Sequence, residues 1–157
     1  MPLYLVRHAK AGSRSDFDGD DIDRPLTNSG RRQADELCRR LSAVSPSVVV
    51  SSPYRRCIET VEPLAVAIDI AVTPDPRLAE LGSEHAKPDT SLFDLLYSLP
   101  DHAVVCSHGD VIPALIEALG ASGWGRVDFL LDGDDRPWLL EANLVSAWHL
   151  CREVARP

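Results

Sequence analysis

The chain has 157 residues, of which 45% are hydrophobic and 25% are charged, a balance typical of one globular domain over residues 1–157. Its formal net charge of -8 argues against general affinity for nucleic acid or for anionic membranes. The first apolar stretch is too short for a signal peptide and no stretch could cross a membrane, so we expect a cytoplasmic protein. The four cysteines form no Cys-x-x-Cys pair, which suits reduced thiols in that compartment.

Strands and helices are predicted to alternate along the chain. The first strand, Leu3–Val6, leads into a polar segment, Gly12–Asp23, which we expect to be a loop that contacts the substrate. The further elements expected are a helix over 30–44, a strand over 47–51, a helix over 53–68 kinked or broken at Pro63, a strand over 70–72, a helix over 91–99, a strand over 103–107, a helix capped by Asp110 and ending near 119, and strands over 127–131, 138–141 and 145–150. This order predicts an α/β fold with three layers, α/β/α, and a mostly parallel sheet.

Three of these strands end in a cation or an imidazole. Arg7 and His8 follow the first strand, Arg56 lies in the first turn of the helix after the second, and His108 follows the strand over 103–107. The carboxyl ends of parallel strands meet at one edge of the sheet, where ligands bind. A guanidinium fork and a helix N-terminus both favour phosphate oxygens. The sequence therefore predicts a site for a phosphoryl anion at this edge.

Four motifs in this order resemble those of the histidine phosphatase superfamily, which has the phosphoglycerate-mutase-like fold. They span residues 3–110 and are Arg7-His8, Ser51-Ser52-Pro53 with Arg56 and Thr60, Leu78-Ala79-Glu80, and Ser107-His108-Gly109. The resemblance implies that His8 is the nucleophile that carries the phosphoryl group and that Glu80 donates a proton to the leaving group. Three residues would surround the phosphate, namely Arg7, Arg56 and His108.

Within that superfamily the chain is most similar to the short bacterial SixA-type phosphohistidine phosphatases. The similar segments are Arg7–Ala11, Asp23–Thr27 and Gly30–Ala34. Ala9 replaces the glycine that usually follows the nucleophile, as it does in that subset. The Trp-Glu-Gly often found after the acid is absent, and Gly82-Ser83-Glu84-His85 stands there instead. Glu84 is therefore the alternative to Glu80 as proton donor.

Phosphoryl transfer suits these residue types. A neutral imidazole can attack phosphorus in line, and two arginines with a protonated His108 can stabilise the charge that develops on the phosphoryl oxygens. No metal or other cofactor is required when side chains supply the positive charge. Lys10, Arg14 and Arg24 are further candidates for binding phosphate or the rest of the substrate, and Gly109 lets the backbone approach a ligand closely. Adjacent helical positions do not share a face, so we expect Arg55 to point away from the site.

The sequence favours a metal-independent phosphatase that acts on phosphohistidine in a partner protein. A phosphatase of small phosphomonoesters or nucleotides would use the same residues, and Trp124 with the 12–23 loop are the candidates for a base-binding surface. A phosphoprotein-binding module would keep the arginines but lose the nucleophile or the acid. A metallohydrolase built on His8, His85 and His108 lacks closely spaced ligands. We expect neither nucleic acid nor a membrane as a partner.

Overall fold

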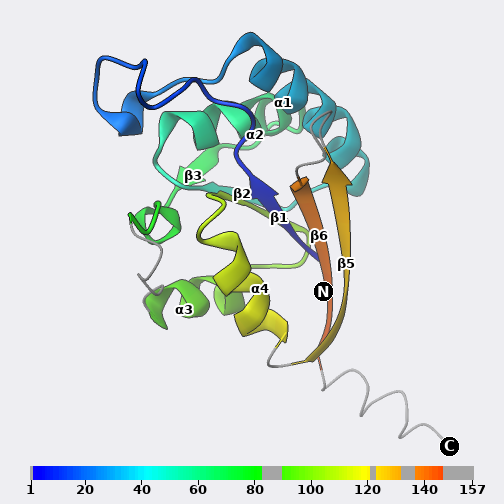
Figure 1. Cartoon of the computed structure of the whole chain (residues 1–157). Coiled ribbons are helices and arrows are strands. Elements are labelled where there is room, and N and C mark those ends of the chain that lie inside the picture. The colour runs from blue at the N-terminus through cyan, green and yellow to red at the C-terminus, as the bar shows by residue number, and fades with distance from the viewer. Residues whose placement is uncertain (1, 83–89, 121–122, 132–136, 147–157) are drawn as a thin grey trace, which may run out of the picture.

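The computed structural model describes residues 2–82, 90–120, 123–131 and 137–146, with side chains for 3–82 and 90–116. Six strands form one sheet in the order β3-β2-β4-β1-β6-β5 (Figure 1). Their bounds are β1 Pro2–Arg7, β2 Val48–Ser51, β3 Val72–Pro74, β4 Ala103–Ser107, β5 Gly123–Leu131 and β6 Pro137–Ser146. The first four strands in chain order are parallel, whereas β6 runs antiparallel to both β1 and β5. The mostly parallel sheet is thus confirmed, and the single domain over residues 1–157 stays a prediction.

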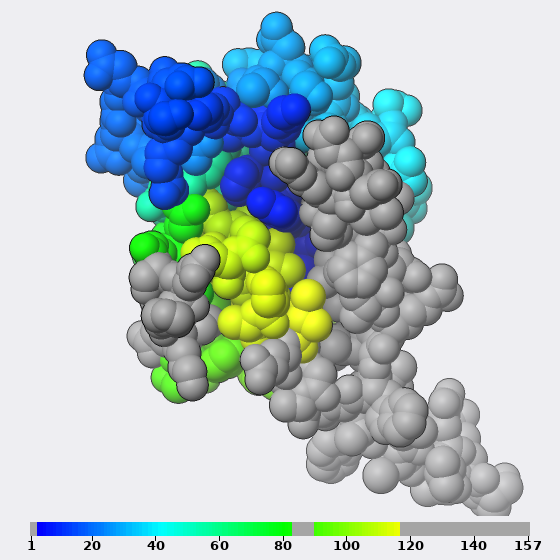
Figure 2. Space-filling model, in the orientation of Figure 1, coloured from blue at the N-terminus to red at the C-terminus, as the bar shows by residue number. Residues whose placement is uncertain are grey.

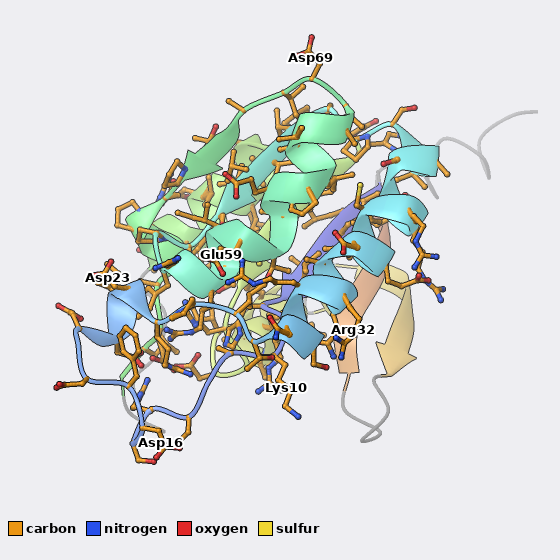
Figure 3. All side chains as sticks on the ribbon, turned by 90° about the horizontal axis from the view of Figure 1, so that it is seen from above. Lys10, Asp16, Asp23, Arg32, Glu59 and Asp69 are labelled. Carbon is orange, nitrogen blue, oxygen red and sulfur yellow. The ribbon has the colours of Figure 1, made fainter. Side chains whose placement is uncertain are left out.

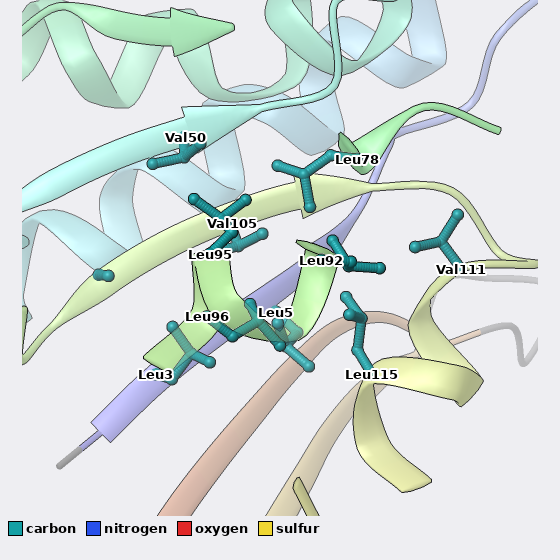
Figure 4. Packing of buried hydrophobic residues seen from close by; sticks show 11 residues of the cluster. Leu3, Leu5, Val50, Leu78, Leu92, Leu95, Leu96, Val105, Val111 and Leu115 are labelled. Atoms are coloured by element: carbon teal, nitrogen blue, oxygen red, sulfur yellow. The ribbon is translucent and has the colours of Figure 1, made fainter. Parts of the chain in front are cut away.

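Helices cover both faces of the sheet. α1 (Asn28–Leu41) and α2 (Arg55–Ala67) pack on one face, and α3 (Thr90–Ser98) and α4 (Ile112–Gly120) pack on the other (Figure 1). Alternation along β1 supplies both interiors, because Leu3 and Leu5 contribute to the core under α3 and α4 while Tyr4 and Val6 contribute to the core under α1 and α2. Figure 4 shows the first of these cores. The three-layer α/β/α architecture is therefore confirmed.

Several boundaries differ from the sequence-based expectations, and the largest shift is at β5, which begins at Gly123 rather than at residue 127. α2 continues through Pro63 without a break, and the helix expected over 30–44 ends at Leu41 and continues as the 3-10 helix η2 (Ser42–Val44). β3 lies two residues later than expected. The two strands expected over 138–141 and 145–150 are one strand, β6, because its pairing with β1 and β5 continues through Asn143, and residues 147–150 lie outside the described part of the chain. In the described residues, no helix is long and apolar enough to cross a membrane.

Asp110 does not cap α4. The Asp110 carboxylate accepts a hydrogen bond from the Leu81 backbone N–H at 2.8 Å, and α4 begins at Ile112. Ile112 N donates instead to the His108 carbonyl, which starts the helix within the backbone itself. The carboxylate thus ties the segment that carries Glu80 to the loop after β4.

Candidate functional site

The register of the parallel strands brings three strand ends together. Arg7 pairs with Ser107, and Ser51 pairs with Cys106. Beyond the strands, His8 N donates to the Ser107 carbonyl at 3.0 Å and Ser52 N donates to the Cys106 carbonyl at 2.9 Å. The loop after β1 (blue), the segment that ends at residue 82 (green) and the segment after β4 (yellow-green) meet on one face of the molecule in Figure 2. The predicted convergence of the strand ends is therefore confirmed.

The loop after β1 is anchored on the N-terminus of α1. Thr27 caps this helix, since its hydroxyl accepts the Gly30 N–H at 3.0 Å, and both its N–H and its hydroxyl donate to the Lys10 carbonyl. A Cβ at Gly30 would overlap that carbonyl oxygen. Thr60 accepts the Ala9 N–H at 2.9 Å. These contacts fix the backbone on both sides of the 12–23 loop and so fix the position of His8.

His8 has one ring nitrogen engaged and one available. Its Nδ1 donates to the Ala9 carbonyl at 2.8 Å, so Nε2 carries the lone pair. Burial is the main cause that lowers the pKa of His8 from 6.5 to about 4. The charges of Arg56 and Arg7 contribute to the same shift, while the hydrogen bond to the Ala9 carbonyl acts in the opposite direction. The ring is half-buried at the end of β1. At neutral pH the imidazole is uncharged and can act as a nucleophile.

His108 has both ring nitrogens engaged. It is 1% exposed, and its Nε2 lies 2.8 Å from the Ser52 hydroxyl oxygen. Its Nδ1 lies 3.5 Å from Nη2 of Arg56, which can only donate, so the proton of the ring belongs on Nε2. A second proton on Nδ1 would face the guanidinium of Arg56, and the protonated His108 that the sequence predicts stays a prediction. The His108 ring lies edge-on to the His8 ring, with 5.4 Å between centroids.

Tyr54 and Ser52 are contacts of the site to which sequence reasoning gave no role. The Tyr54 ring packs against the edge of the His108 ring, with 4.8 Å between centroids, and lies 4.5 Å from the guanidinium carbon of Arg56. Both residues follow β2 within the motif that the sequence highlighted. Their position next to Pro53 was the available signal, whereas the partner that they share, His108, lies more than fifty residues away, directly after β4.

Arg56 is fully buried and Arg55 is exposed, as the helical pattern predicts. The Arg56 side chain is 0% exposed, whereas that of Arg55 is 53% exposed and pairs with Glu59 at 2.7 Å. Nη1 of Arg56 donates to the Asp21 carbonyl at 2.8 Å, and its Nη2 lies 3.2 Å from the Glu80 carboxylate. Its Nε is buried with no hydrogen-bond partner among the described residues. A buried charge requires partners that accept hydrogen bonds or carry the opposite charge. For Arg56 these partners are Asp21 and Glu80, which belong to two other segments of the chain.

Asp21 is the site residue that sequence reasoning missed. It lies in the 3-10 helix η1 (Asp21–Asp23), and its carboxylate contacts Arg14 at 3.0 Å, Arg24 at 2.7 Å and Arg56 at 3.1 Å. Burial acts to raise the pKa of Asp21, but hydrogen bonds from Arg14 and Arg24 and the charge of Arg56 hold it well below its ordinary value. Arg14 also pairs with Glu80 at 2.6 Å. The structure thus brings Arg14, Arg24, Arg56 and Glu80 together around one loop carboxylate.

The remaining residues that the sequence predicts for the site are Arg7, Gly109, Lys10 and Glu84. Arg7 is exposed, and a Cβ at Gly109 would lie 2.9–3.1 Å from its guanidinium atoms, so the glycine makes room for Arg7. Lys10 is exposed, and Figure 3 shows its side chain pointing outward from the loop. Glu84 and His85 lie outside the described residues. Within the described part of the chain, no group of three or more His, Cys, Asp or Glu side chains could hold a metal ion.

Comparisons with known proteins identify the family to which this chain belongs. The sequence model of the histidine phosphatase superfamily (branch 1) matches residues 3–92, more than half of the chain. The 8-oxo-(d)GTP phosphatase of Mycolicibacterium smegmatis is 37% identical over 117 residues, which are 73% of this chain and 36% of that protein. The chain therefore spans about a third of the length of that relative. A shorter stretch of 45 residues, 29% of this chain and 14% of the relative, is 58% identical to the D-alanine--D-alanine ligase of Bordetella petrii.

Two solved structures are similar to this chain in fold. SixA of Nakamurella multipartitia is 30% identical, with a TM-score of 0.56 over 75% of this chain and 64% of that one. A protein histidine phosphatase SixA complexed with tungstate is 18% identical, with a TM-score of 0.61 over 91% and 97%, and this likeness concerns the fold alone. The residues that the sequence model of the superfamily matches, 3–92, include His8, directly after β1, and Arg56, in the first turn of α2. This chain belongs to the histidine phosphatase superfamily.

Proposed function

We propose that this chain is a metal-independent phosphatase in which His8 carries the phosphoryl group. The observation that supports this most directly is the state of His8: its Nδ1 donates to the Ala9 carbonyl, and its pKa of about 4 leaves Nε2 with a lone pair at neutral pH. A nucleophile must be unprotonated and positioned beside the positive charge that holds the phosphoryl group. Arg7 and Arg56 provide that charge, since both lower the pKa of His8 through their electrostatic fields.

The proposed reaction has two steps. Nε2 of His8 forms a bond to phosphorus as the bond between phosphorus and the leaving atom breaks, and the leaving atom takes a proton from Glu80. Water then attacks the phosphoimidazole, gives its proton to the Glu80 carboxylate, and releases inorganic phosphate with His8 restored. Arginine charge stabilises the equatorial oxygens in both transition states. His108 holds Arg56 and Ser52 in place beside the reacting group.

The substrate we propose is phosphohistidine on a partner protein. The sequence similarity to SixA proteins supports it, and so does the exposed position of Arg7 at the rim, which a phosphorylated side chain on another protein could reach. A nucleotide is the second candidate, because the relative that is 37% identical is an 8-oxo-(d)GTP phosphatase. The alignment covers 36% of that relative, so the activity in its name need not belong to the aligned part.

Steady-state kinetics with a chelator present test both parts of this proposal. We expect turnover of p-nitrophenyl phosphate in EDTA, and a higher kcat/KM on a histidine-phosphorylated carrier protein than on any nucleotide. Loss of turnover in EDTA with rescue by a divalent ion would contradict the metal-independent mechanism. A hundredfold preference for a nucleotide, about 2.7 kcal/mol in transition-state binding, would contradict the phosphohistidine assignment. Binding of phosphoprotein without any turnover would favour a phosphoprotein-binding module.

A further inference from the structure

One loop carboxylate engages three of the arginines expected to bind the substrate. The two Asp21 oxygens lie 2.7 Å from Nε of Arg24, 3.0 Å from Nη2 of Arg14 and 3.1 Å from Nη2 of Arg56. The contacts with Arg24 and Arg14 are charge-assisted hydrogen bonds, and the contact with Arg56 is an ion pair. A phosphoryl group offers the same kind of oxygen acceptor to the same donors. Asp21 therefore makes the contacts that a bound phosphoryl group would make.

Arg56 cannot serve both anions through the same atoms. Its Nη1 donates to the Asp21 carbonyl, and its Nη2 is shared between the carboxylates of Asp21 and Glu80. The side chain is fully buried, so it has no room to turn its terminal nitrogens toward another direction. Nη2 has two N–H groups, and the carboxylates of Asp21 and Glu80 already engage it. A phosphoryl group that binds Arg56 through Nη2, whether or not it also uses Nε, therefore has to replace a carboxylate there.

The structure of the loop makes such a replacement feasible. Asp21 lies in a single 3-10 turn whose Asp20 cap accepts the Ile22 N–H at 3.2 Å, and most of the residues from Ser13 to Asp20 are exposed. The two ends of the loop are fixed by the bridge between Ala11 and Leu26. Displacement of the turn would therefore leave β1, α1 and the position of His8 unchanged.

We propose that Asp21 is an internal anion that competes with the substrate's phosphoryl group for Arg14, Arg24 and Arg56, and that substrate binding displaces it. This inference rests on the proposed function of the same site. A phosphomonoester or phosphoramidate near neutral pH carries up to two negative charges and three terminal oxygens, against one charge and two oxygens for the carboxylate. A phosphodiester carries a single charge and has no such advantage. Asp21 thus selects for terminal phosphoryl groups over diesters.

The same exchange would act on Glu80. Its carboxylate is held by Arg14 at 2.6 Å and by Arg56 at 3.2 Å. A phosphoryl group that takes up these two guanidinium groups would leave the Glu80 carboxylate without its ion pairs, so that it can take a proton from water and pass it to the leaving group. Displacement of the internal carboxylates and placement of the proton donor are then parts of one event.

Asp21→Asn tests the competition, and Asp23→Asn is the matched control. Asp23 is exposed in the same 3-10 turn, so its replacement removes the same charge next to the site. Calorimetry with inorganic phosphate should show at least tenfold tighter binding to Asp21→Asn and a change of less than twofold for Asp23→Asn. Weaker or unchanged binding in Asp21→Asn would overturn the proposal, because Asp21 would then be positioning the arginines rather than competing for them.

Hydrogen–deuterium exchange on the unmodified chain provides a second test that needs no variant. Saturating inorganic phosphate should increase exchange at the backbone amides of residues 22–24, whose N–H groups bond within the turn. Unchanged or slower exchange there would show that the turn stays closed on the anion and would contradict displacement. Neither test needs turnover. A chain that binds phosphate as expected and hydrolyses no substrate would therefore overturn the proposed function while leaving this inference standing.

Discussion

Two histidines lie at equivalent places in the fold and have opposite surroundings. His8 follows β1 and His108 follows β4, and these strands are parallel neighbours in register. The His8 ring is half-buried, and among the described residues its one hydrogen bond is local, to the carbonyl of the next residue. The His108 ring is buried, and its contacts come from α2 and from the segment between β2 and α2, namely Ser52, Tyr54, Arg56 and Cys57.

This difference separates a reactive group from a supporting one. A ring nitrogen with a free lone pair can form a bond to phosphorus, whereas a ring whose two nitrogens both contact neighbouring side chains helps to hold those neighbours in position. The local hydrogen bond of His8 fixes its tautomer without blocking Nε2. The distant partners of His108 connect the ends of β2 and β4, where the Arg56 guanidinium must stay aligned. The predictions below test this division of roles.

His8→Ala and His108→Ala should separate the two histidines most strongly. Removing the nucleophile should reduce kcat/KM on p-nitrophenyl phosphate by at least about 10⁴-fold. Removing a supporting ring should cost about 10²–10³-fold, as the loss of a single oxyanion donor does. Steady-state kinetics on both variants, with circular dichroism to check folding, give the comparison. Equal losses would contradict the division of roles.

Arg56→Ala should lower kcat/KM by about 10²–10³-fold, or about 2.7–4 kcal/mol of transition-state stabilisation. The same change leaves the Asp21 and Glu80 carboxylates without their buried partner, so the melting temperature should also fall. Arg55→Ala is the control, because that side chain is exposed and its pairing with Glu59 on the surface of α2 contributes little. Similar kinetics for the two variants would show that the phosphate does not bind at Arg56.

Glu80→Gln should affect substrates according to their leaving groups. An alkyl phosphate needs protonation of its departing oxygen, and its kcat/KM should fall by about 10²-fold or more. p-Nitrophenyl phosphate leaves as a stable phenolate and should lose much less. An equal loss on both substrates would contradict a proton-donor role. A selective loss seen only in Glu84→Gln would assign the role to Glu84.

NMR titration should give His8 a pKa of about 4, because burial and two arginines oppose protonation. The unfolded chain, with an ordinary pKa of 6.5, takes up the proton first as the pH falls. The free energy of unfolding should therefore decrease between pH 6.5 and about 4, and His8→Asn should remove that part of the pH dependence. A midpoint between pH 6 and 7 for the His8 ring would contradict the burial described above.

Much of the fold follows from local patterns in the sequence. The continuous apolar run of β1 predicts a strand buried on both faces, and the apolar stripe of α1 predicts its packing on the sheet. The element boundaries that differ from the sequence-based expectations depend on contacts with neighbouring strands and helices. Asn143 interrupts the apolar pattern of β6, but strand pairing on both sides keeps the strand continuous, and the packing of α2 tolerates Pro63.

The candidate site also combines residues that local sequence patterns predict with residues that such patterns do not predict. Arg7, His8, Arg56 and His108 were predictable because each follows a strand, and strand ends meet at one edge. Asp21 was not predictable, because its contact with Arg56 joins residues 35 positions apart and has no periodicity. Asp110 was misassigned as a helix cap for the same reason, since its partner is the Leu81 amide in another segment.

The central claim is that His8 becomes covalently phosphorylated during turnover. Rapid acid-free quenching of the chain with a phosphorylated substrate, followed by tandem mass spectrometry, measures this directly. The account predicts an acid-labile, base-stable phosphoryl group on His8 that forms and decays at rates consistent with kcat, and none in His8→Ala. A phosphoryl group on His108 or another residue, or full turnover without any phosphorylated enzyme, would contradict it.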